Sequence, residues 1–514
     1  MKPYKILLFL ISIFLVLSFI SFIYPSNGIQ IGNNLLLRFP DFSSLLTPEE
    51  KKHADITEIL EYHQSDIVEN IENLAKDSIK EENDNLSISK DSIINKTPSD
   101  SLLLDSIKPS TNKNQPGAIR QHLEYPDNNN AVLFPFFDNL KGLKESKELI
   151  RILHYGDSQI EGDRISSYIR NELQKQFGGS GIGLFAPVLI KGTNISMKHK
   201  LTGSWDRYTI QSIKKGTIFH KRLGALMSFG RFAPENSDES IMYYGDINLK
   251  KSNITYQRTR KFKQCRVFYG YNNGPFIAEL KYKDKTLDAE LIPVSRQLNT
   301  LTWDIDETLD EITISFKGED SPDLYGIALD DHSGVAVDNI PLRGSSGTDF
   351  TKTDLVFLRS MYQQLNAKLI ILQFGVNLVP YITNDYSYYQ KRFYKQLKTL
   401  KSLRPDISII VIGVSDMSQN KNGQYISYPN IEKIRDAQKN AAFKADCAFW
   451  DMYEAMGGKN SMPAWVNANP ALARTDFTHF TWKGATVISK MFFEALMNDY
   501  NQYLNEPKIN NDPN

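Results

Sequence analysis

Two stretches of alternating strand-like and helix-like sequence, far apart along the chain, constrain the fold most strongly. The first runs from an apolar segment at 149–153, through Gly156-Asp157-Ser158, to a helical repeat at 165–173 that ends at Gly178-Gly179. The second alternates strand-like and helical segments at 369–374, 386–403, 408–412, 431–445 and 447–450. Such alternation is typical of a parallel sheet covered by helices on both faces. We therefore predict an α/β domain made from two parts of the chain, 139–195 and 321–505.

The segment between these two parts has a different period. Apolar and polar residues alternate at 265–269, 276–280 and 311–316, and the turn sequence Asn272-Asn273-Gly274 lies between the first two runs. Period-two runs at this spacing indicate an antiparallel sandwich. We expect such a β-sandwich as an insert at 196–320.

The N-terminus carries an apolar run. Lys2 and Lys5 precede a charge-free segment at 6–24, which Pro25 follows. As a helix this segment would span about 28 Å, close to the thickness of a bilayer core. Its length and its flank favour an uncleaved membrane anchor at 1–28 over a cleaved signal peptide. The lysines would stay in the cytoplasm, so the rest of the chain would cross the membrane.

Residues 29–138 are predicted to connect the anchor to the folded part. Helical spacing occurs within 47–76, at positions that include Ile56 and Ile59, and suggests a short stalk helix. The segment 77–116 is rich in Ser, Asp, Asn, Lys and Pro, which cannot bury enough apolar surface to offset chain entropy. We expect a flexible tether there.

Charge and cysteine content argue against two classes of protein. The chain has 60 basic and 60 acidic residues, so no global basic excess exists to bind nucleic acid. Its 2 cysteines, Cys265 and Cys447, cannot form a disulfide framework or a multi-cysteine zinc site.

The turn that contains Ser158 has the properties of a nucleophile site. A serine between a strand and a helix is exposed at the carboxyl edge of the sheet, where the helix dipole favours developing negative charge. A base is then required, and two histidines after Ser158 have a nearby carboxylate, His479 and His332. We prefer His479, because Asp476 stands three residues before it and can reach the imidazole across a turn.

Two further positions suit an oxyanion site. Asn377 follows the strand-like segment 369–374, where a side-chain amide can donate to an oxyanion. Gly344 follows a strand-like segment at 335–340 and can offer a backbone N–H, with Gly347 as its rival.

The order of these motifs resembles the SGNH (GDSL-type) hydrolase superfamily. Its first, second, third and fifth blocks match Gly156-Asp157-Ser158, Gly344, Gly375-Val376-Asn377 and Asp476-Phe477-Thr478-His479. The resemblance implies a flavodoxin-like three-layer α/β/α fold. It also implies that Ser158 is the nucleophile, His479 the base and Asp476 its orienting acid, with Gly344 and Asn377 in the oxyanion hole. The chain departs from the family pattern at Gln159 and Leu378.

The interrupting β domain narrows the resemblance to bacterial peptidoglycan O-acetylesterases, which carry a carbohydrate-binding-like insert. The segments 333–338 and 449–458 resemble the same group. This implies an enzyme of the cell envelope that removes O-acetyl groups from a glycan and needs no metal or organic cofactor. Membrane attachment would hold it on the periplasmic side of the inner membrane, or it would be secreted there if the signal is cleaved. The alternatives are an O-acetyltransferase with the same triad and a catalytically silent glycan-binding protein.

The insert contains aromatic residues that are candidates for stacking on sugar rings or for filling a sandwich core. They are Trp205, Tyr208, Tyr243, Tyr244, Tyr269, Tyr271 and Trp303.

Overall fold

The computed structural model describes scattered residues between 4 and 37, and then residues 53–63, 121–190, 195–235 and 240–506. The chain forms two compact units, Met1–His53 and Ala54–Asn514. In the first, strands β1 (Ile29–Ile31) and β2 (Leu35–Leu37) pair antiparallel. None of the described helices is long and apolar enough to cross a membrane. The predicted anchor at 6–24 lies largely outside the described residues, and the predicted tether at 77–116 lies entirely outside them.

The second unit contains a six-stranded sheet in the order β16-β4-β17-β18-β21-β3. The first five strands are parallel, and β3 adds antiparallel at the edge. In chain order the parallel strands run 2-1-3-4-5, which is the flavodoxin-like arrangement. Their bounds are β3 Leu123–Glu124, β4 Leu149–Gly156, β16 Gly334–Pro341, β17 Ala367–Gln373, β18 Ser408–Ile412 and β21 Ala448–Trp450.

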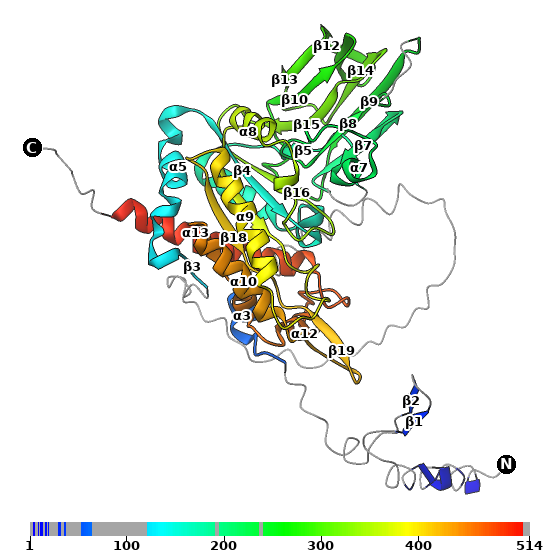
Figure 1. The fold of residues 1–514 in the computed structure, drawn as a ribbon, viewed down its shortest axis with the longest axis vertical. Coiled ribbons are helices and arrows are strands. Elements are labelled where there is room, and N and C mark those ends of the chain that lie inside the picture. The colour runs from blue at the N-terminus through cyan, green and yellow to red at the C-terminus, as the bar shows by residue number, and fades with distance from the viewer. Residues whose placement is uncertain are drawn as a thin grey trace, which may run out of the picture. The chain divides into compact units, whose positions relative to one another are not determined.

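Helices cover both faces of this sheet and give the three layers that the motifs predict (Figure 1). The strands point alternate residues to each side: Leu153 and Tyr155 join one core, whereas Ile150 and Ile152 join the other. The first core includes α8 (Leu355–Gln364), α9 (Ser387–Leu403) and α10 (Ile431–Lys444). The second includes α5 (Phe134–Ser146), α6 (Ser166–Phe177), α11 (Met452–Met456), α12 (Ser461–Asn467) and α13 (Trp482–Asn505).

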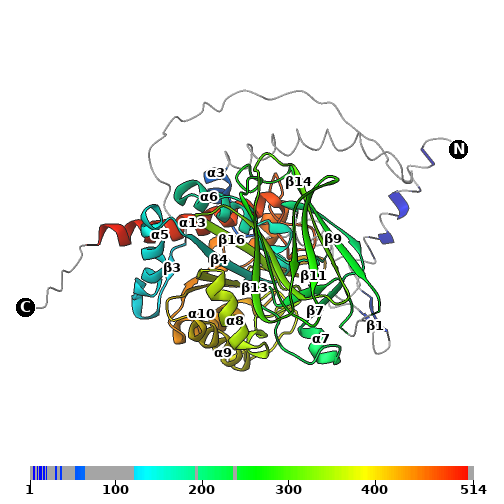
Figure 2. The ribbon, with the colours of Figure 1, turned by 90° about the horizontal axis from the view of Figure 1, so that it is seen from above.

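The interrupting β domain consists of two antiparallel sheets around an apolar core (Figure 2). One has the order β13-β10-β15-β8-β7, with β5 (Gly183–Phe185) also paired to β15, and the other has the order β12-β11-β14-β9-β6. The bounds are β6 Met197–Gly203, β7 Asp206–Thr209, β8 Ser228–Arg231, β9 Tyr243–Lys251, β10 Gln264–Asn272, β11 Phe276–Tyr282, β12 Lys285–Ile292, β13 Ser295–Asp304, β14 Glu311–Gly318 and β15 Asp323–Asp330. The strands β5 and β15 lie outside the predicted limits of 196–320, so the sandwich recruits a strand on each side of them.

The sandwich and the α/β domain share a buried boundary. Arg151 of β4 is fully buried, and its guanidinium pairs with Asp330 of β15 and, at 2.5 Å, with Asp338 of β16. Apolar packing crosses the same boundary, since Tyr325 of β15 contacts Phe357 of α8 with ring centroids 4.5 Å apart. The two parts are therefore joined by one continuous interior.

The described structure also begins earlier than the predicted domain start at 139. Helix α3 (Thr57–Tyr62) buries Ile56 and Ile59 in the second core, and the Ala54 amide donates to the Asn460 carbonyl at 3.2 Å. Helix α5 begins at Phe134. The apolar spacing that suggested a stalk thus serves, in its described part, to pack a short helix against the α/β domain.

Candidate active site

Ser158 stands where β4 meets a tight turn. The strand ends at Gly156, and a 3₁₀ segment begins at Ser158. A side chain at Gly156 would place its Cβ 2.9 Å from the Gln373 carbonyl of the neighbouring strand, so only glycine lets β4 and β17 pair this closely. Ser158 therefore lies at the carboxyl edge of the sheet, where the paired strands β4 and β17 end.

The structure brings Ser158, His479 and Asp476 into one hydrogen-bonded chain. The Ser158 Oγ lies 2.8 Å from His479 Nε2, and His479 Nδ1 lies 2.9 Å from Asp476 Oδ2. The loop that carries His479 and Asp476 precedes α13 and comes from the far end of the sequence. This arrangement lets Nδ1–H donate to the carboxylate while Nε2 accepts the serine proton.

Asp476 is kept ionised by its surroundings. Partial burial acts to raise its pKa, but hydrogen bonds from the His479 amide, the His479 ring and the Thr478 amide outweigh burial, and the pKa is lowered from its usual value. The two amides donate to Oδ1 at 2.9 and 3.0 Å. Oδ2 is thereby left to the imidazole.

His332, the other candidate base, is not part of this arrangement. Its side chain is half exposed, and its Nε2 lies 3.6 Å from Asp304 Oδ1 at the end of β13. The structure therefore joins His479, and not His332, to Ser158.

The two predicted oxyanion residues lie on loops that contact each other. Asn377 follows β17, and its Nδ2 donates to the Ser345 carbonyl at 3.0 Å, next to Gly344. The Gly344 loop is fixed to the nucleophile turn by two contacts: Leu342 N donates to the Gly156 carbonyl at 2.7 Å, and Arg343 pairs with Glu161 at 2.5 Å.

The structure separates Gly344 from its rival Gly347. Both have a φ of +75°, but a Cβ at Gly347 would lie 2.8 Å from the Phe374 ring, whereas a Cβ at Gly344 would meet no heavy atom within 4 Å. Gly347 is thus required for packing, and Gly344 borders open space.

Three residues that the motif analysis gave no role hold the site together. The buried Gln159 side chain donates from Nε2 to the Thr478 carbonyl at 2.6 Å and to Ser415 Oγ at 3.1 Å, and so ties the nucleophile turn to the histidine loop. Arg164 donates to the Ser158 carbonyl and to the Phe480 carbonyl, both at 3.2 Å. Gln159 was visible in the sequence only as a departure from the family pattern.

Asp157 is the third of these residues and links two strands. Its buried carboxylate accepts the Gln159 amide at 3.0 Å, and the Gly375 and Val376 amides at 3.0 and 3.3 Å. Burial raises its pKa to about 7, against the lowering effect of those three amides. The contacts fix the Ser158 turn to the loop that carries Asn377.

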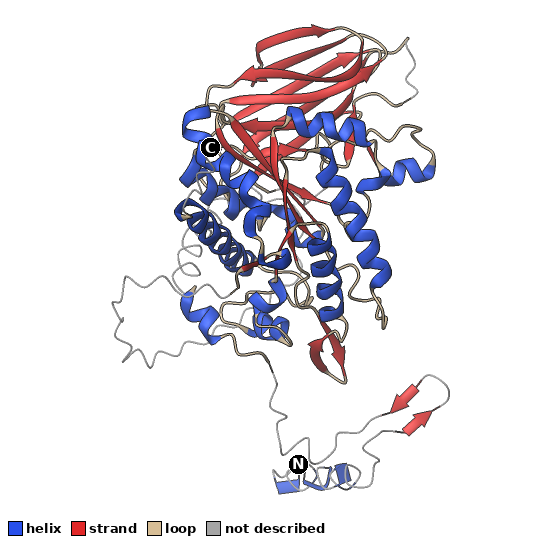
Figure 3. Cartoon of the chain, turned by 60° about the vertical axis from the view of Figure 1, so that its left-hand side comes forward, coloured by secondary structure: helices blue, strands red, loops and turns tan. Residues whose placement is uncertain are grey.

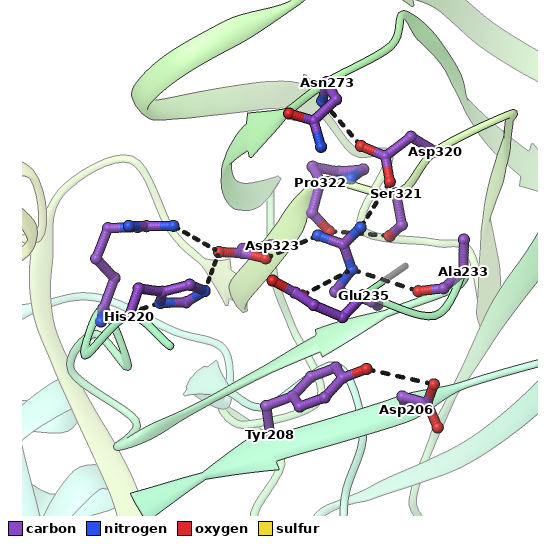
Figure 4. A network of polar contacts seen from close by, with 12 residues as sticks. Asp206, Tyr208, His220, Ala233, Glu235, Asn273, Asp320, Ser321, Pro322 and Asp323 are labelled. Carbon is purple, nitrogen blue, oxygen red and sulfur yellow. Dashed lines mark hydrogen bonds and ion pairs between the residues drawn. The ribbon is translucent and has the colours of Figure 1, made fainter. Parts of the chain in front are cut away.

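A second polar cluster lies in the sandwich (Figure 4). His220, Glu235 and Asp323 bring a nitrogen and two carboxylate oxygens within 4.8 Å of one another. Arg231 already pairs with Asp323 at 3.0 Å and with Glu235 at 3.6 Å, and Arg222 lies 3.6 Å from Asp323. Because these two guanidinium groups supply the positive charge, the cluster is explained as an ion-pair network between β8 and β15.

Most of the aromatic residues proposed for sugar stacking in the insert serve its interior or are covered. Tyr208, Tyr269 and Trp303 are buried, and the Tyr271 ring has the Arg222 guanidinium 3.8 Å from its centroid. Trp205 and Tyr243 are partly buried and pack against the sandwich core. Tyr244 is the exposed one of the set, at 56%.

The fold of this chain is similar to that of a protein of known structure, although its sequence matches no known family. No protein-family model and no curated protein matches the sequence. A solved peptidoglycan O-acetylesterase matches 74% of this chain and 99% of its own, with a TM-score of 0.58 and 20% identity. The chain shares the peptidoglycan O-acetylesterase fold. The resemblance that the motifs predicted is confirmed at this level.

Two other solved structures match less well. An acetyl xylan esterase matches 32% of this chain and 81% of its own, at 15% identity and a TM-score of 0.25. A family two carbohydrate esterase from Clostridium thermocellum matches 53% of this chain and 95% of its own, at 8% identity and a TM-score of 0.22. The assignment of the peptidoglycan O-acetylesterase fold rests on the first comparison.

Proposed function

We propose that this chain is a serine esterase that removes O-acetyl groups from a cell-envelope glycan through an acetyl-serine intermediate. The observation that carries the proposal is the geometry of the triad, with 2.8 Å between Ser158 Oγ and His479 Nε2 and 2.9 Å between His479 Nδ1 and Asp476 Oδ2. Its place at the carboxyl edge of a flavodoxin-like sheet supports the same assignment.

The acylation step follows from this geometry. His479 Nε2 takes the Ser158 proton while Oγ attacks the acetyl carbonyl carbon, and Asp476 stabilises the imidazolium that forms. The tetrahedral intermediate then collapses, the bond between the acetyl carbon and the sugar oxygen breaks, and Nε2 returns the proton to that oxygen. Water, activated by His479, attacks the acetyl-serine, and acetate and free Ser158 are released.

The oxyanion is assigned to three donors: the amides of Ser158 and Gly344 and the Asn377 side chain. A carboxamide has two N–H groups. One of those on Asn377 donates to the Ser345 carbonyl at 3.0 Å, which fixes the group and leaves the other for the substrate. A donor held in place before the reaction costs no reorganisation when charge develops.

An acetylated glycan is the proposed substrate because the fold is shared with a peptidoglycan O-acetylesterase across 99% of that protein. The proposed location is the cell envelope, on the periplasmic side of the inner membrane, because the apolar run at 6–24 follows two lysines. Such a location would place the enzyme beside the polymer.

The test is release of acetate from purified O-acetylated peptidoglycan, with O-acetylated xylan as a second polymer and Ser158→Ala as the control. We expect acetate from peptidoglycan with the wild-type chain and none above background with the variant. Transfer of acetyl groups to an added oligosaccharide without acetate release would assign a transferase instead. Absence of turnover on every acetyl ester, with retained glycan binding, would contradict an enzymatic role.

A further inference from the structure

We infer that Tyr425 and Phe477 form an aromatic platform beside the triad on which a sugar ring of the substrate stacks. The inference rests on the proposed function and deepens it, because it locates glycan recognition in the α/β domain next to the reacting atoms. Tyr425 lies on β20 (Gln424–Ser427), which forms a hairpin with β19 (Ser418–Lys421). Figure 1 shows this hairpin, marked β19, projecting from the α/β domain at the end far from the sandwich.

Phe477 belongs to the catalytic loop itself. It follows Asp476 directly and stands two residues before His479, so its Cα lies within about 7.6 Å of the Cα of His479. Its φ is +53°, a left-handed conformation that is uncommon for a bulky residue. Backbone strain of this kind concentrates at functional sites, where the surrounding structure maintains it. In this loop the strained residue is Phe477, and its ring stacks on the Tyr425 side chain.

The hairpin is fixed to the catalytic loop and to the domain beneath it. The Ser418 amide donates to the Phe477 carbonyl at 3.0 Å. At the other strand, Ser427 Oγ donates to the buried Asp416 at 2.6 Å, and the Ser427 amide donates to Asn460 Oδ1 at 2.9 Å. Tyr425 is therefore held at a defined position relative to His479.

The two rings are parallel, and one of them is open to solvent. Their planes differ by 5° and their centroids lie 3.5 Å apart. Tyr425 is nevertheless 40% exposed, and it belongs to none of the apolar cores formed by the described residues. Since Phe477 covers one face of the Tyr425 ring, the exposed surface lies on its other side and edge. An aromatic face of this kind packs against the apolar C–H face of a sugar ring.

Glycan is the occupant that the surroundings favour. The platform adjoins a triad that is open at the surface, where Ser158 and His479 are partly exposed. A glycan that extends from the triad toward the β19–β20 hairpin would meet the exposed Tyr425 ring. Most of the aromatic candidates in the sandwich are buried or covered, so the Tyr425–Phe477 pair is better placed to bind a sugar near the reacting ester.

The test compares two substrates across variants of Tyr425. For an O-acetylated oligosaccharide released from peptidoglycan, we expect Tyr425→Ala to raise KM about tenfold, the order of effect of losing one aromatic contact. On 4-nitrophenyl acetate its kcat should stay within about twofold of wild type, because that ester has no sugar ring whose C–H face could stack on Tyr425. Tyr425→Phe and Tyr425→Trp should keep the KM for the oligosaccharide near the wild-type value. The control is Tyr62→Ala, at a tyrosine of α3 with a similar exposure of 43%. It should leave the KM for the oligosaccharide and the kcat on 4-nitrophenyl acetate unchanged.

Three outcomes would overturn the platform or separate it from the esterase proposal. An equal loss of kcat on both substrates would show that Tyr425 only supports the catalytic loop, and an unchanged KM in Tyr425→Ala would show that no sugar stacks there. If the wild-type chain hydrolyses neither substrate, the esterase proposal fails. The platform is then judged by calorimetry of the deacetylated oligosaccharide, where equal affinity of wild type and Tyr425→Ala would contradict it.

Discussion

Asp476 organises the candidate site because its two carboxylate oxygens have different partners. Oδ1 accepts the amides of Thr478 and His479, which shapes the loop, and Oδ2 accepts His479 Nδ1, which orients the ring. A spacing of three residues is what allows one side chain to do both. The same residue thus shapes the loop and favours the His479 tautomer that carries its proton on Nδ1.

Removal of the nucleophile or the base should abolish turnover to a similar extent. We expect Ser158→Ala and His479→Ala to lower kcat on a small acetyl ester by several orders of magnitude, and Asp476→Asn to lower it less. His332→Ala is the matched control, since its side chain lies at the sandwich beside Asp304, and it should stay within about tenfold of wild type. Near-normal turnover in His479→Ala together with collapse in His332→Ala would reverse the assignment.

Asn377 should matter for kcat and not for folding. Loss of one oxyanion donor typically lowers kcat by about 10²- to 10³-fold, so we expect Asn377→Ala to fall in that range on 4-nitrophenyl acetate. KM and the thermal midpoint should change little, because among the described residues the Asn377 side chain makes a single hydrogen bond, to the Ser345 carbonyl. A variant with wild-type kcat would remove Asn377 from the oxyanion hole.

Gln159 should affect catalysis through position alone. Gln159→Leu keeps the buried volume close to that of glutamine and removes the donors to the Thr478 carbonyl and Ser415 Oγ. The histidine loop would then lose its tie to the nucleophile turn, and a misplacement on the order of 1 Å can cost about 10²-fold in rate. We expect a lower kcat with an unchanged cooperative melt. Wild-type kcat in a folded Gln159→Leu variant would contradict this role.

The sequence indicated Ser158, His479 and Asp476 as a candidate triad, but it did not indicate the residues that support them, for a physical reason. The relation of Asp476 to His479 is local, so spacing alone indicates it. The contacts of Gln159 and Asp157 join positions 256 and 218 residues apart, at Ser415 and Gly375, and no local pattern marks such partners. They become apparent only when the fold places the loops together.

At the scale of elements, β4 leads into the proposed nucleophile, Ser158, and also forms part of the boundary with the sandwich. Ser158 follows its carboxyl end, and Arg151 near its other end pairs with Asp330 and Asp338. Burial raises the pKa of Asp338 to about 6, while the Arg151 charge acts to lower it. The strand therefore depends on a buried cation to keep two carboxylates beside each other.

Arg151→Met should destabilise the fold strongly. Breaking a buried ion pair from one side costs about 3–5 kcal/mol, because the remaining charges stay buried. Without Arg151 the pKa of Asp338 rises further above its unfolded value, and stability from a raised pKa is lost as pH rises through it. The deficit in unfolding free energy, measured in urea, should thus grow above pH 6.

The matched control for Arg151→Met is an ion pair at the surface. Lys250 lies 3.7 Å from Glu311 and is half exposed, so Lys250→Met should cost less than about 1 kcal/mol. Two results would show that the buried charges are not coupled as described. One is a similarly small loss of unfolding free energy for Arg151→Met, and the other is a loss that becomes smaller as the pH rises.

Element prediction worked where the periodicity was clear and failed at the limits of the insert. The alternating runs at 265–269, 276–280 and 311–316 fall within β10, β11 and β14. By contrast β15 is buried along its whole length, because it packs against the sandwich core on one side and the α/β domain on the other. A strand with two covered faces has no alternation, so its sequence gave no indication that it belongs to the sandwich.

At the scale of the whole molecule, the sandwich and the α/β domain are not separable modules. One core joins Phe229 and Phe268 of the sandwich sheet to Phe357 and Met361 of α8. The buried pairs of Arg151 cross the same boundary. Figure 3 shows strands of the sandwich lying directly against the α/β domain.

Deletion of the insert tests this continuity. We expect a chain that lacks 196–320 to show no cooperative thermal unfolding and no turnover of 4-nitrophenyl acetate, even though Ser158, Asp476 and His479 all remain. The deletion removes β8 and β10, which pair with β15, and it leaves Tyr325 of β15 and Phe357 of α8 without their apolar cover. Exposure of that surface costs about 25 cal/mol for each Å² and favours aggregation. A chain that begins at Ala54 and keeps the whole second unit is the control, and it should melt cooperatively and retain wild-type turnover. A deletion variant that unfolds cooperatively and hydrolyses the small ester like this control would show that the α/β domain is stable by itself and that the shared core is dispensable.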